Sequence, residues 1–309
     1  MNEFAVLADI TCDLSPEIRS RFGVDGYLSG YITTPSGEQI STRLDMSPSE
    51  LDAFYSSLRS HKHGYKTSAA SVPEIAEAFE SFVTQGKDVL ALSISSRLSA
   101  TYNLMVQARD SVLEKHARAN IVVVDSLKYS AALGLLTIEA CRLRERGCSI
   151  QETAEKIEGR RSQVHQMGTM DDLFWVASQG RISNAKAFFG TIAGIKTMGD
   201  FNNEGMVTPL ANVSGFDRAF AAVVEYVKRT ITAPEEQIVV VAHSDRRTQA
   251  ETLATKIRQT VAPKEVLVSE IYPSSGVNIG PGLCAAYYFG REITDLQFEK
   301  ATINEIVAK

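Results

Sequence analysis

Three uninterrupted apolar runs constrain the fold more than any other feature of this sequence. Residues 89–94, 121–124 and 238–242 consist of Val, Ile, Leu and Ala, with a single Ser in the first run. A short polar loop follows each run, and an amphipathic helical pattern follows each loop. Apolar strands that alternate with such helices are typical of parallel strands buried on both faces. We therefore predict an α/β fold built on a parallel sheet.

The length of the chain predicts two domains. The chain has 309 residues, and a single hydrophobic core stops growing beyond about 250–300 residues. The regular alternation weakens between about residues 155 and 235, where glycine becomes frequent. We place an N-terminal α/β domain at residues 1–160 and a second α/β domain at residues 161–309.

Composition excludes several classes of protein. The formal net charge is −5, which does not suit a general nucleic-acid binder. No apolar run approaches the roughly 18–20 residues that span a bilayer, so we expect no integral membrane segment. The N-terminus carries Glu3 and Asp9 where a signal peptide requires basic and then apolar residues. We expect a soluble cytoplasmic protein.

The cysteines and histidines predict no metal site. Four cysteines form no CxxC pair, and we expect free thiols in a reducing compartment rather than disulfides. His61 and His63 lie in a polar stretch without a carboxylate at ligand spacing. We expect that stretch to be a solvated loop.

Polar loops follow the apolar runs at residues 89–94 and 121–124 and a shorter apolar run at residues 4–8, which we also expect to be a buried strand. These loops are Asp9–Asp13, Ser95–Thr101 and Asp125–Ser126. Ligands of doubly wound sheets bind beyond the carboxyl ends of the strands, and the start of a helix favours an anion. Ser99 can donate a hydrogen bond to a carboxylate or phosphate there. It can equally serve as an ordinary helix cap.

Two further segments are candidates for ligand binding. The hydroxyls of residues 66–71 precede a helix that starts near Pro73, and taken alone helix capping explains them more simply than ligand binding does. Residues 275–282 contain three glycines and predict a loop that approaches another segment or a ligand closely. This loop matches neither a dinucleotide fingerprint nor a phosphate loop.

The sequence offers few combinations of residues that could form a catalytic site. No GxSxG motif surrounds any serine. His165 near Asp171 and Asp172, and His243 beside Ser244, are the histidines to consider for catalysis. A structural role explains His165 more simply.

Seven segments together resemble the DegV family. Residues 95–103 resemble its SSxLSGTY segment, and six other segments follow the family in the same order along the chain. These are residues 9–13 (DST.D), 66–68 (TSQP), 124–126 (IDS), 179–183 (GGRIS), 195–196 (IKP) and 278–282 (HTGPG). The matches cover nearly the whole chain, so the chain is identified as similar to that family.

The resemblance implies a two-domain α/β protein that binds one long-chain fatty acid between its domains. Some relatives are the binding subunits of bacterial fatty acid kinase, and they present the acyl carboxylate to a separate ATP-dependent kinase. The resemblance thus implies a binder without catalysis, cofactor or metal, with a possible kinase partner. Carried over by position, Thr67 and Ser99 donate hydrogen bonds to the carboxylate. The implied head-group residues are Thr67, Ser68, Ser96, Ser99, Asn278 and Gly280.

An acyl tail requires an apolar lining, because each buried CH₂ contributes about 0.8 kcal/mol. The candidates for this lining are apolar residues of the second domain, although ordinary core packing explains each of them, taken alone, more simply. They are Phe188, Phe189, Ile192 and Ile195.

The sequence also departs from the family pattern. Asn278 replaces the histidine of HTGPG, and Val213 stands near the position of an arginine found in many relatives. Both changes remove cationic partners, whose hydrogen bonds contribute roughly 1.5–3 kcal/mol each. The amide of Asn278 donates and also accepts, so it permits a protonated acid or a neutral polar head group.

Three functional hypotheses remain. The first is a non-catalytic protein that binds a fatty acid or a related acyl lipid. The second is a hydrolase or transferase acting on an acyl or phosphorylated substrate, with Ser99 and either His165 or His243. The third is a regulatory protein whose lipid site has decayed, motivated by Ile10 as well as by Val213 and Asn278.

Overall fold

The chain divides into two compact units. The computed structural model describes residues 3–62, 64–182 and 194–308. Unit 1 comprises Met1–Met46 and His63–Arg161, and unit 2 comprises Ser47–Lys62 and Ser162–Lys309. The segment Ser47–Lys62 therefore packs within unit 2, although it falls inside the range that we predicted for the N-terminal domain.

Unit 1 contains a four-stranded parallel sheet, as the apolar runs predicted. The strand order is β2-β1-β6-β7, and every neighbouring pair runs parallel. The two central strands are almost wholly buried, which explains why their sequences are continuously apolar. The strands are β1 (Phe4–Asp9), β2 (Gly26–Leu28), β6 (Asp88–Ser93) and β7 (Ile121–Asp125).

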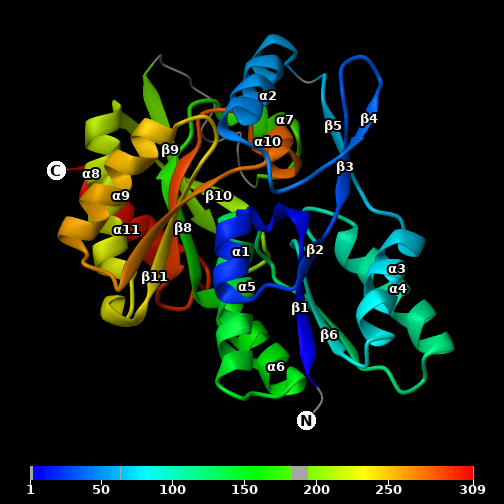
Figure 1. The fold of residues 1–309 in the computed structure, drawn as a ribbon. Coiled ribbons are helices and arrows are strands. Elements are labelled where there is room, and N and C mark those ends of the chain that lie inside the picture. The colour runs from blue at the N-terminus through cyan, green and yellow to red at the C-terminus, as the bar shows by residue number, and fades with distance from the viewer. Residues whose placement is uncertain (1–2, 63, 183–193, 309) are drawn as a thin grey trace. The chain divides into compact units, whose positions relative to one another are not determined.

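Helices cover both faces of this sheet. Figure 1 shows α3 and α4 on one side and α1, α5 and α6 on the other. Phe79 of α3 and Met105 of α4 are fully buried in one cluster with Leu7 and Val89 of the sheet. The elements around the sheet are η1 (Ile10–Cys12), α1 (Pro16–Phe22), α3 (Val72–Val83), α4 (Thr101–Lys115), α5 (Ala131–Glu145) and α6 (Ile150–Arg160).

A small antiparallel sheet completes unit 1. Its order is β4-β3-β5. The strands are β3 (Gly30–Thr33), β4 (Gln39–Ser41) and β5 (Lys66–Ala69).

The main sheet of unit 2 is mixed rather than parallel. In the order β12-β11-β13-β8, β11 pairs parallel with β12 and antiparallel with β13, and β13 pairs antiparallel with β8. An apolar run reports burial and not direction, so the sequence did not reveal this. The strands are β8 (Val164–Thr169), β11 (Ile238–His243), β12 (Glu265–Glu270) and β13 (Cys284–Phe289).

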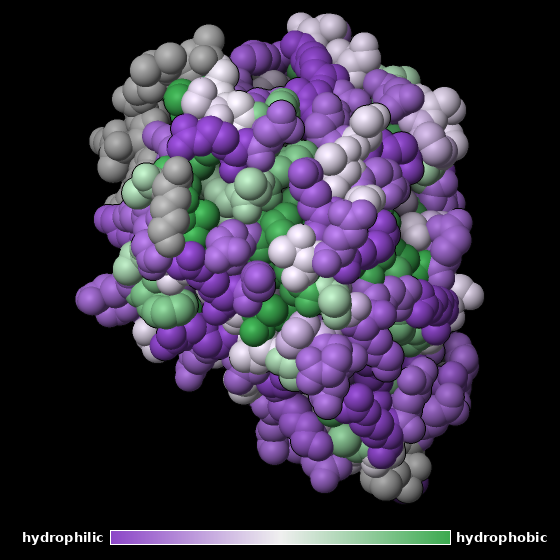
Figure 2. All heavy atoms as spheres, turned by 90° about the vertical axis from the view of Figure 1, so that its left-hand side faces the viewer, coloured by the Kyte–Doolittle hydropathy of each residue, from purple (hydrophilic) through white to green (hydrophobic). Residues whose placement is uncertain are grey.

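A β-hairpin and several helices surround the main sheet of unit 2. The hairpin consists of the antiparallel strands β9 (Ile195–Phe201) and β10 (Val207–Ser214), within the region where glycine is frequent. Hydrophilic residues cover most of the face that Figure 2 shows, the side on which α8, α9 and α11 lie. The remaining elements are η2 (Arg161–Gln163), α2 (Pro48–Ser60), α7 (Leu173–Ser178), α8 (Phe216–Thr230), η4 (Pro234–Glu236), α9 (Arg247–Thr260), α10 (Pro273–Ile279) and α11 (Gln297–Val307).

The glycine-containing segment 275–282 is largely helical, which contradicts our prediction of a loop. Pro273 occupies the first turn of α10, and the helix continues to Ile279 before ending at Gly280, where φ is +76°. The Nε1–H of Trp175 donates to the carbonyl of Val277 at 2.9 Å, and Tyr55 of α2 lies against Gly276. Tertiary packing thus overrides weak helix propensity here.

The cysteines agree with the sequence prediction of free thiols. Cys12, Cys141 and Cys284 are buried, Cys148 is half-buried, and all four are free. Burial raises the pKa of the three buried thiols to about 12. Among the described residues, no group of His, Cys, Asp and Glu has a metal-binding arrangement, and no helix there has the length and hydrophobicity to cross a membrane.

Candidate functional site

The three polar loops converge at the carboxyl edge of the unit 1 sheet, as the strand pattern predicted. Because β1, β6 and β7 are adjacent and parallel, the loops that follow them lie at one edge. The backbone N–H of Ser96 donates to Asp125 Oδ1 at 3.2 Å, and the N–H of Ser95 donates to the carbonyl of Lys128 at 2.9 Å. These bonds fix the loop after β6 to the loop after β7.

Two hydroxyls of the segment after β6 lie near the loop after β1. Ser99 Oγ lies 2.7 Å from Thr101 Oγ1, and the Thr101 side chain is close enough to the carboxyl group of Asp9 to lower its pKa. On its other side, Asp9 Oδ1 accepts from the hydroxyl of Thr11 at 2.6 Å and from its N–H at 2.8 Å. Asp9 is only 5% exposed. Burial raises the pKa of Asp9, and the hydrogen bonds from Thr11 together with the nearby Thr101 hydroxyl partly oppose that rise.

Ser99 is not a conventional cap of α4. The N-cap position belongs to Ala100, which makes no side-chain cap bond. Ser99 Oγ accepts a hydrogen bond of 3.3 Å from the Thr101 N–H, so it satisfies one of the unpaired amides of the first turn. The capping interpretation therefore explains only part of what this side chain does.

Thr67 and Ser68 lie on a strand and not at a helix cap. Both belong to β5, where Thr67 pairs with Ile32 and Ser68 with Tyr31. The cap of α3 is Ser71, which forms a capping box with Glu74. Because side chains alternate along a strand, Thr67 and Ser68 point to opposite faces of the small sheet. One head group therefore does not contact both side chains.

The small sheet adjoins the same edge of unit 1. Gly30 of β3 pairs with Ala69 of β5, and a Cβ atom at Gly30 would lie 3.8 Å from a methyl group of Ile10. Ile10 directly follows Asp9 in η1. The strand that carries Thr67 is thus linked through β3 to the loop after β1. Ser96 is exposed on the loop after β6.

Asn278 and Gly280 lie in unit 2. The amide of Asn278, in the last turn of α10, donates to the carbonyl of Ser274 at 3.2 Å. A Cβ atom at Gly280 would come within 2.6 Å of the Trp175 ring, and the carbonyl of Gly280 accepts from Ser244 Oγ at 2.7 Å. Packing alone therefore accounts for a glycine at position 280.

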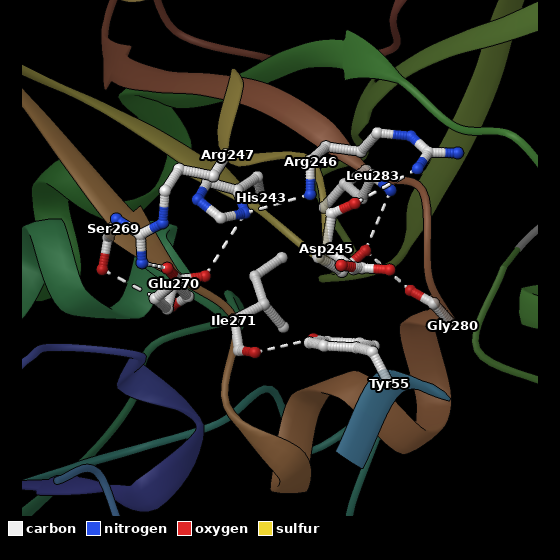
Figure 3. Close-up of polar contacts among 11 residues, drawn as sticks. Tyr55, His243, Asp245, Arg246, Arg247, Ser269, Glu270, Ile271, Gly280 and Leu283 are labelled. Carbon is white, nitrogen blue, oxygen red and sulfur yellow. Dashed lines mark hydrogen bonds and ion pairs between the residues drawn. The ribbon is translucent and has the colours of Figure 1, made fainter. Parts of the chain in front are cut away.

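His243 is a buried neutral histidine at the end of β11. Figure 3 shows its ring beside Arg246, Arg247 and Glu270. Nδ1 accepts from the N–H of Arg246 at 3.3 Å, while Glu270, 3.3 Å from Nδ1, pairs with Arg247. Burial and then the charge of Arg247 lower the pKa of His243 to about 4. We therefore do not count the approach of Glu270 as an ion pair.

His165 is fully engaged inside unit 2. Its Nδ1 lies 2.6 Å from Asp200 Oδ2, and its Nε2 lies 2.8 Å from the carbonyl of Arg291. Asp200 also accepts from Tyr226 and from two backbone N–H groups, so its carboxylate has donors on both oxygens. Both ring nitrogens of His165 therefore donate, and the histidine is a structural imidazolium paired with Asp200. Asp171 pairs instead with Lys196 and Arg246, and Asp172 with Lys62.

An apolar pocket lies between β8, β9, β10 and α7 in unit 2. Its lining includes Leu173, Ile182, Val207 and Leu283, together with the buried Gln166. Of the predicted tail-lining residues, Ile195 begins β9 and is half-buried, and it is not part of this lining. Phe188, Phe189 and Ile192 lie outside the described residues.

Sequence reasoning overlooked Asp9 and Thr101 as site residues. Asp9 was placed in a strand-end loop and Thr101 at the start of a helix, but neither received a role. A signal was present, since an acid that ends a buried strand beside a Ser-x-Thr helix start brings a carboxylate and hydroxyls to one edge. Val213, the residue at the position of the missing arginine, is buried on β10 opposite Lys196.

These features define an α/β protein with a hydroxyl-lined candidate site at a parallel strand edge. The sequence model described as "Uncharacterised protein, DegV family" matches residues 3–291. A DegV domain-containing protein of Clostridium perfringens is 32% identical over 294 residues, which cover 94% of this chain and 98% of the relative. The chain belongs to the DegV family.

Solved structures of DegV proteins share the fold. A DegV family protein of Thermus thermophilus, described as binding fatty acid, matches with a TM-score of 0.82 at 23% identity, covering 94% of this chain and all 100% of that one. The Streptococcus pneumoniae fatty acid kinase B3 protein, loaded with linoleic acid, matches with a TM-score of 0.78 at 18% identity over the same shares. The similarity confirms the α/β, DegV-like fold predicted from the sequence.

Proposed function

We propose that this protein binds a long-chain fatty acid without transforming it. The observation that carries the proposal is the hydroxyl chain of Ser99 and Thr101 at the carboxyl edge of the unit 1 sheet. Hydroxyls beside a helix start provide donors for a carboxylate. The fatty acids named for the relatives from Thermus thermophilus and Streptococcus pneumoniae support the same ligand class.

Thr67 and Ser99 are the proposed head-group donors. Asn278 is a further candidate, because its amide can serve an ionised acid, a protonated acid or a neutral polar head. Ser68 is a weaker candidate, since it points away from the face that carries Thr67. The tail-lining role of Ile195 stays a prediction, as does the cytoplasmic location.

The alternative of a hydrolase or transferase has less support. His165 donates through both ring nitrogens to Asp200 and Arg291, so it has no lone pair with which to accept a proton from a serine. His243 uses Nδ1 as an acceptor for a backbone amide and is 1% exposed.

Native mass spectrometry after purification without added lipid tests the proposal, followed by identification of any extracted ligand. We expect one fatty acid per chain. Thr67→Ala combined with Ser99→Ala should weaken retention by about 100-fold or more, because two charge-assisted bonds contribute roughly 1.5–3 kcal/mol each. The matched control is Ser81→Ala with Thr84→Ala, which removes two hydroxyls that, within the described part of the chain, bond only to carbonyls of α3. Equal retention by the two double variants would contradict the head-group assignment.

We also propose that the bound acid is presented to an ATP-dependent fatty acid kinase. The support is the name of the Streptococcus pneumoniae relative. Acyl phosphate should form from ATP and fatty acid only when this protein and a fatty acid kinase are both present. Acyl phosphate formation by this protein alone would favour the enzyme hypothesis instead.

A further inference from the structure

A buried glutamine lines the apolar pocket of unit 2 without a partner for its side-chain oxygen. Gln166 belongs to β8 and is 3% exposed. Its backbone N–H donates to Asp200 Oδ1 at 2.7 Å, but its Oε1 has no hydrogen-bond partner among the described residues. A buried acceptor in this state is unfavourable, because it has lost its water without gaining a donor.

The position of Gln166 on β8 directs its side chain to the pocket. Side chains alternate along a strand, and the pocket lining includes Gln166, Gly168 and Met170, which occupy every second position. Thr169 Oγ1 also lacks a partner among the described residues, but the alternation directs Thr169 to the opposite face of β8. We therefore assign the unpaired acceptor of this pocket to Gln166.

The remainder of the lining is largely apolar. Thr197 contributes a hydroxyl, but this hydroxyl already donates to Asn212 Oδ1 at 3.0 Å. The pocket leaves about 280 Å³ unfilled, including open space at its mouth, and such a lining suits a hydrocarbon chain rather than a charged group. The buried apolar side chains around it are Leu173 of α7, Met198 of β9, Val207 of β10 and Leu283.

We propose that this pocket holds the chain of an acyl ligand that carries a hydroxyl group, and that Gln166 is the residue that selects this hydroxyl. The inference rests on the proposed function, because it specifies the chain of the same fatty acid. The ligand hydroxyl donates its hydrogen to Gln166 Oε1. A plain methylene group at this place displaces water from that oxygen without replacing the hydrogen bond, so the unsubstituted acid binds less tightly.

The carboxylate of the ligand does not serve as the partner of Gln166. An ionised carboxylate has no hydrogen to donate to Oε1, and the burial of its charge among apolar side chains is strongly unfavourable. The proposed donors for the carboxylate, Thr67 and Ser99, belong to unit 1. The selected hydroxyl is therefore on the chain and not at the head group.

Competition between octadecanoate and hydroxylated octadecanoates tests the selection. The probes form a series of hydroxyoctadecanoates that differ only in the carbon that carries the hydroxyl, and native mass spectrometry of the full-length protein measures which acid is retained. We expect the wild-type protein to bind at least one of these isomers about tenfold more tightly than octadecanoate. A difference of this size corresponds to roughly one hydrogen bond to an otherwise unpaired acceptor.

Gln166→Met should abolish this preference while binding persists. Methionine is unbranched like glutamine but has no amide oxygen, so octadecanoate should bind more tightly and the preferred hydroxylated isomer less tightly than in the wild-type protein. The ratio of the two affinities should fall from about ten to about one or below. Gln166→Leu serves as the second variant if Gln166→Met does not fold.

The matched control is Met198→Leu, which alters an apolar side chain of the same lining and removes no oxygen atom. It should change both affinities alike and leave their ratio at the wild-type value. Equal binding of octadecanoate and every hydroxylated isomer by the wild-type protein, a preference that survives Gln166→Met, or an equal loss of preference in Met198→Leu would overturn the selection alone. A wild-type protein that binds neither octadecanoate nor any hydroxylated isomer would overturn the proposed function instead.

Discussion

Individual residues show how burial decides the role of an ionisable group in this protein. Asp9, His165 and His243 are all buried, yet their partners differ. Asp9 has hydroxyls around it, His165 has a carboxylate, and His243 has a backbone amide and a nearby arginine. Desolvation penalises each charge. Asp200 offsets that penalty for His165, whereas the carboxylate nearest His243, Glu270, is already paired with Arg247.

His243 predicts a loss of stability in mild acid. Its pKa is lowered to about 4 in the folded protein from an ordinary value of 6.5, so the unfolded chain binds a proton between those values and the folded chain does not. The contribution of His243 to the free energy of unfolding is therefore fully present above pH 6.5, and it declines by roughly 3 kcal/mol as the pH falls to 4. Urea unfolding between pH 4 and 7.5 should show this decline in the wild-type protein and a flatter profile in His243→Gln.

His116→Gln is the control for that measurement, because the side chain of His116 is 34% exposed. Its profile should follow the wild-type profile throughout. If the profile of His243→Gln also followed it, the neutral buried histidine would be contradicted.

At the scale of the elements, the N-terminus of α4 differs from those of three other helices, because its hydroxyl residues do not form a capping box. The helices α2, α3 and α6 begin with capping boxes, whereas α4 begins at Ala100 without a side-chain cap. The sequence element that starts α4 instead places Ser99 and Thr101 beside Asp9. The helix that adjoins the proposed head group is thus the one that lacks the usual stabilising device among these four.

Ser71→Ala should lower stability and leave fatty acid retention unchanged, whereas Ser99→Ala should mainly lower retention. Loss of the capping hydroxyl at Ser71 should lower the free energy of unfolding by about 1 kcal/mol and leave fatty acid retention unchanged. Ser99→Ala should reduce retention with a smaller effect on stability, because its bond to the Thr101 N–H replaces only part of a cap. Chemical denaturation and native mass spectrometry of both variants measure these effects. The same signature in both variants would contradict the distinction.

The elements also show which parts of the fold are predictable from the sequence. The apolar runs predicted β6, β7 and β11 to within a residue or two, because burial on both faces leaves a continuous pattern. The antiparallel direction of β13 was not predictable, since it depends on the neighbours that the strand finds. The helix α10 was missed because Gly276 and Asn278 are weak helix formers, and its packing on Tyr55 and Trp175 is tertiary.

The candidate site was predictable to a similar degree. Adjacent parallel strands place the loops after β1 and β6 at one edge, and this alone brings Asp9 and Ser99 together. The opposite directions of Thr67 and Ser68 require knowing that they lie on a strand.

At the scale of the whole molecule, the path of the chain matters most. The segment Ser47–Lys62 belongs to unit 2, while the residues on either side of it belong to unit 1. The hydroxyl of Tyr55 donates to the carbonyl of Ile271 at 2.6 Å, and Leu51, Phe54 and Leu58 on α2 are buried. Unit 1 is therefore not a continuous piece of the sequence.

A fragment of residues 1–161 should consequently behave poorly. Its α2 lacks the partners in α10, so the apolar side chains of α2 become exposed and the fragment should self-associate. Replacement of residues 48–60 by a Gly/Ser linker should restore a monomer. Size-exclusion chromatography and dye binding to exposed apolar surface compare the two fragments. A monomeric fragment that retains α2 would contradict this assignment.

Because α2 belongs to unit 2, it is synthesised long before the residues against which it packs. Tyr55 and Ile271 are separated by 216 residues, and a ribosome adds about 5–20 residues each second. The apolar face of α2 thus leaves the ribosome roughly 10–40 s before its partner is made. Throughout that interval the apolar side chains of residues 48–60 in a nascent chain of this protein lack the partners that cover them in the folded protein.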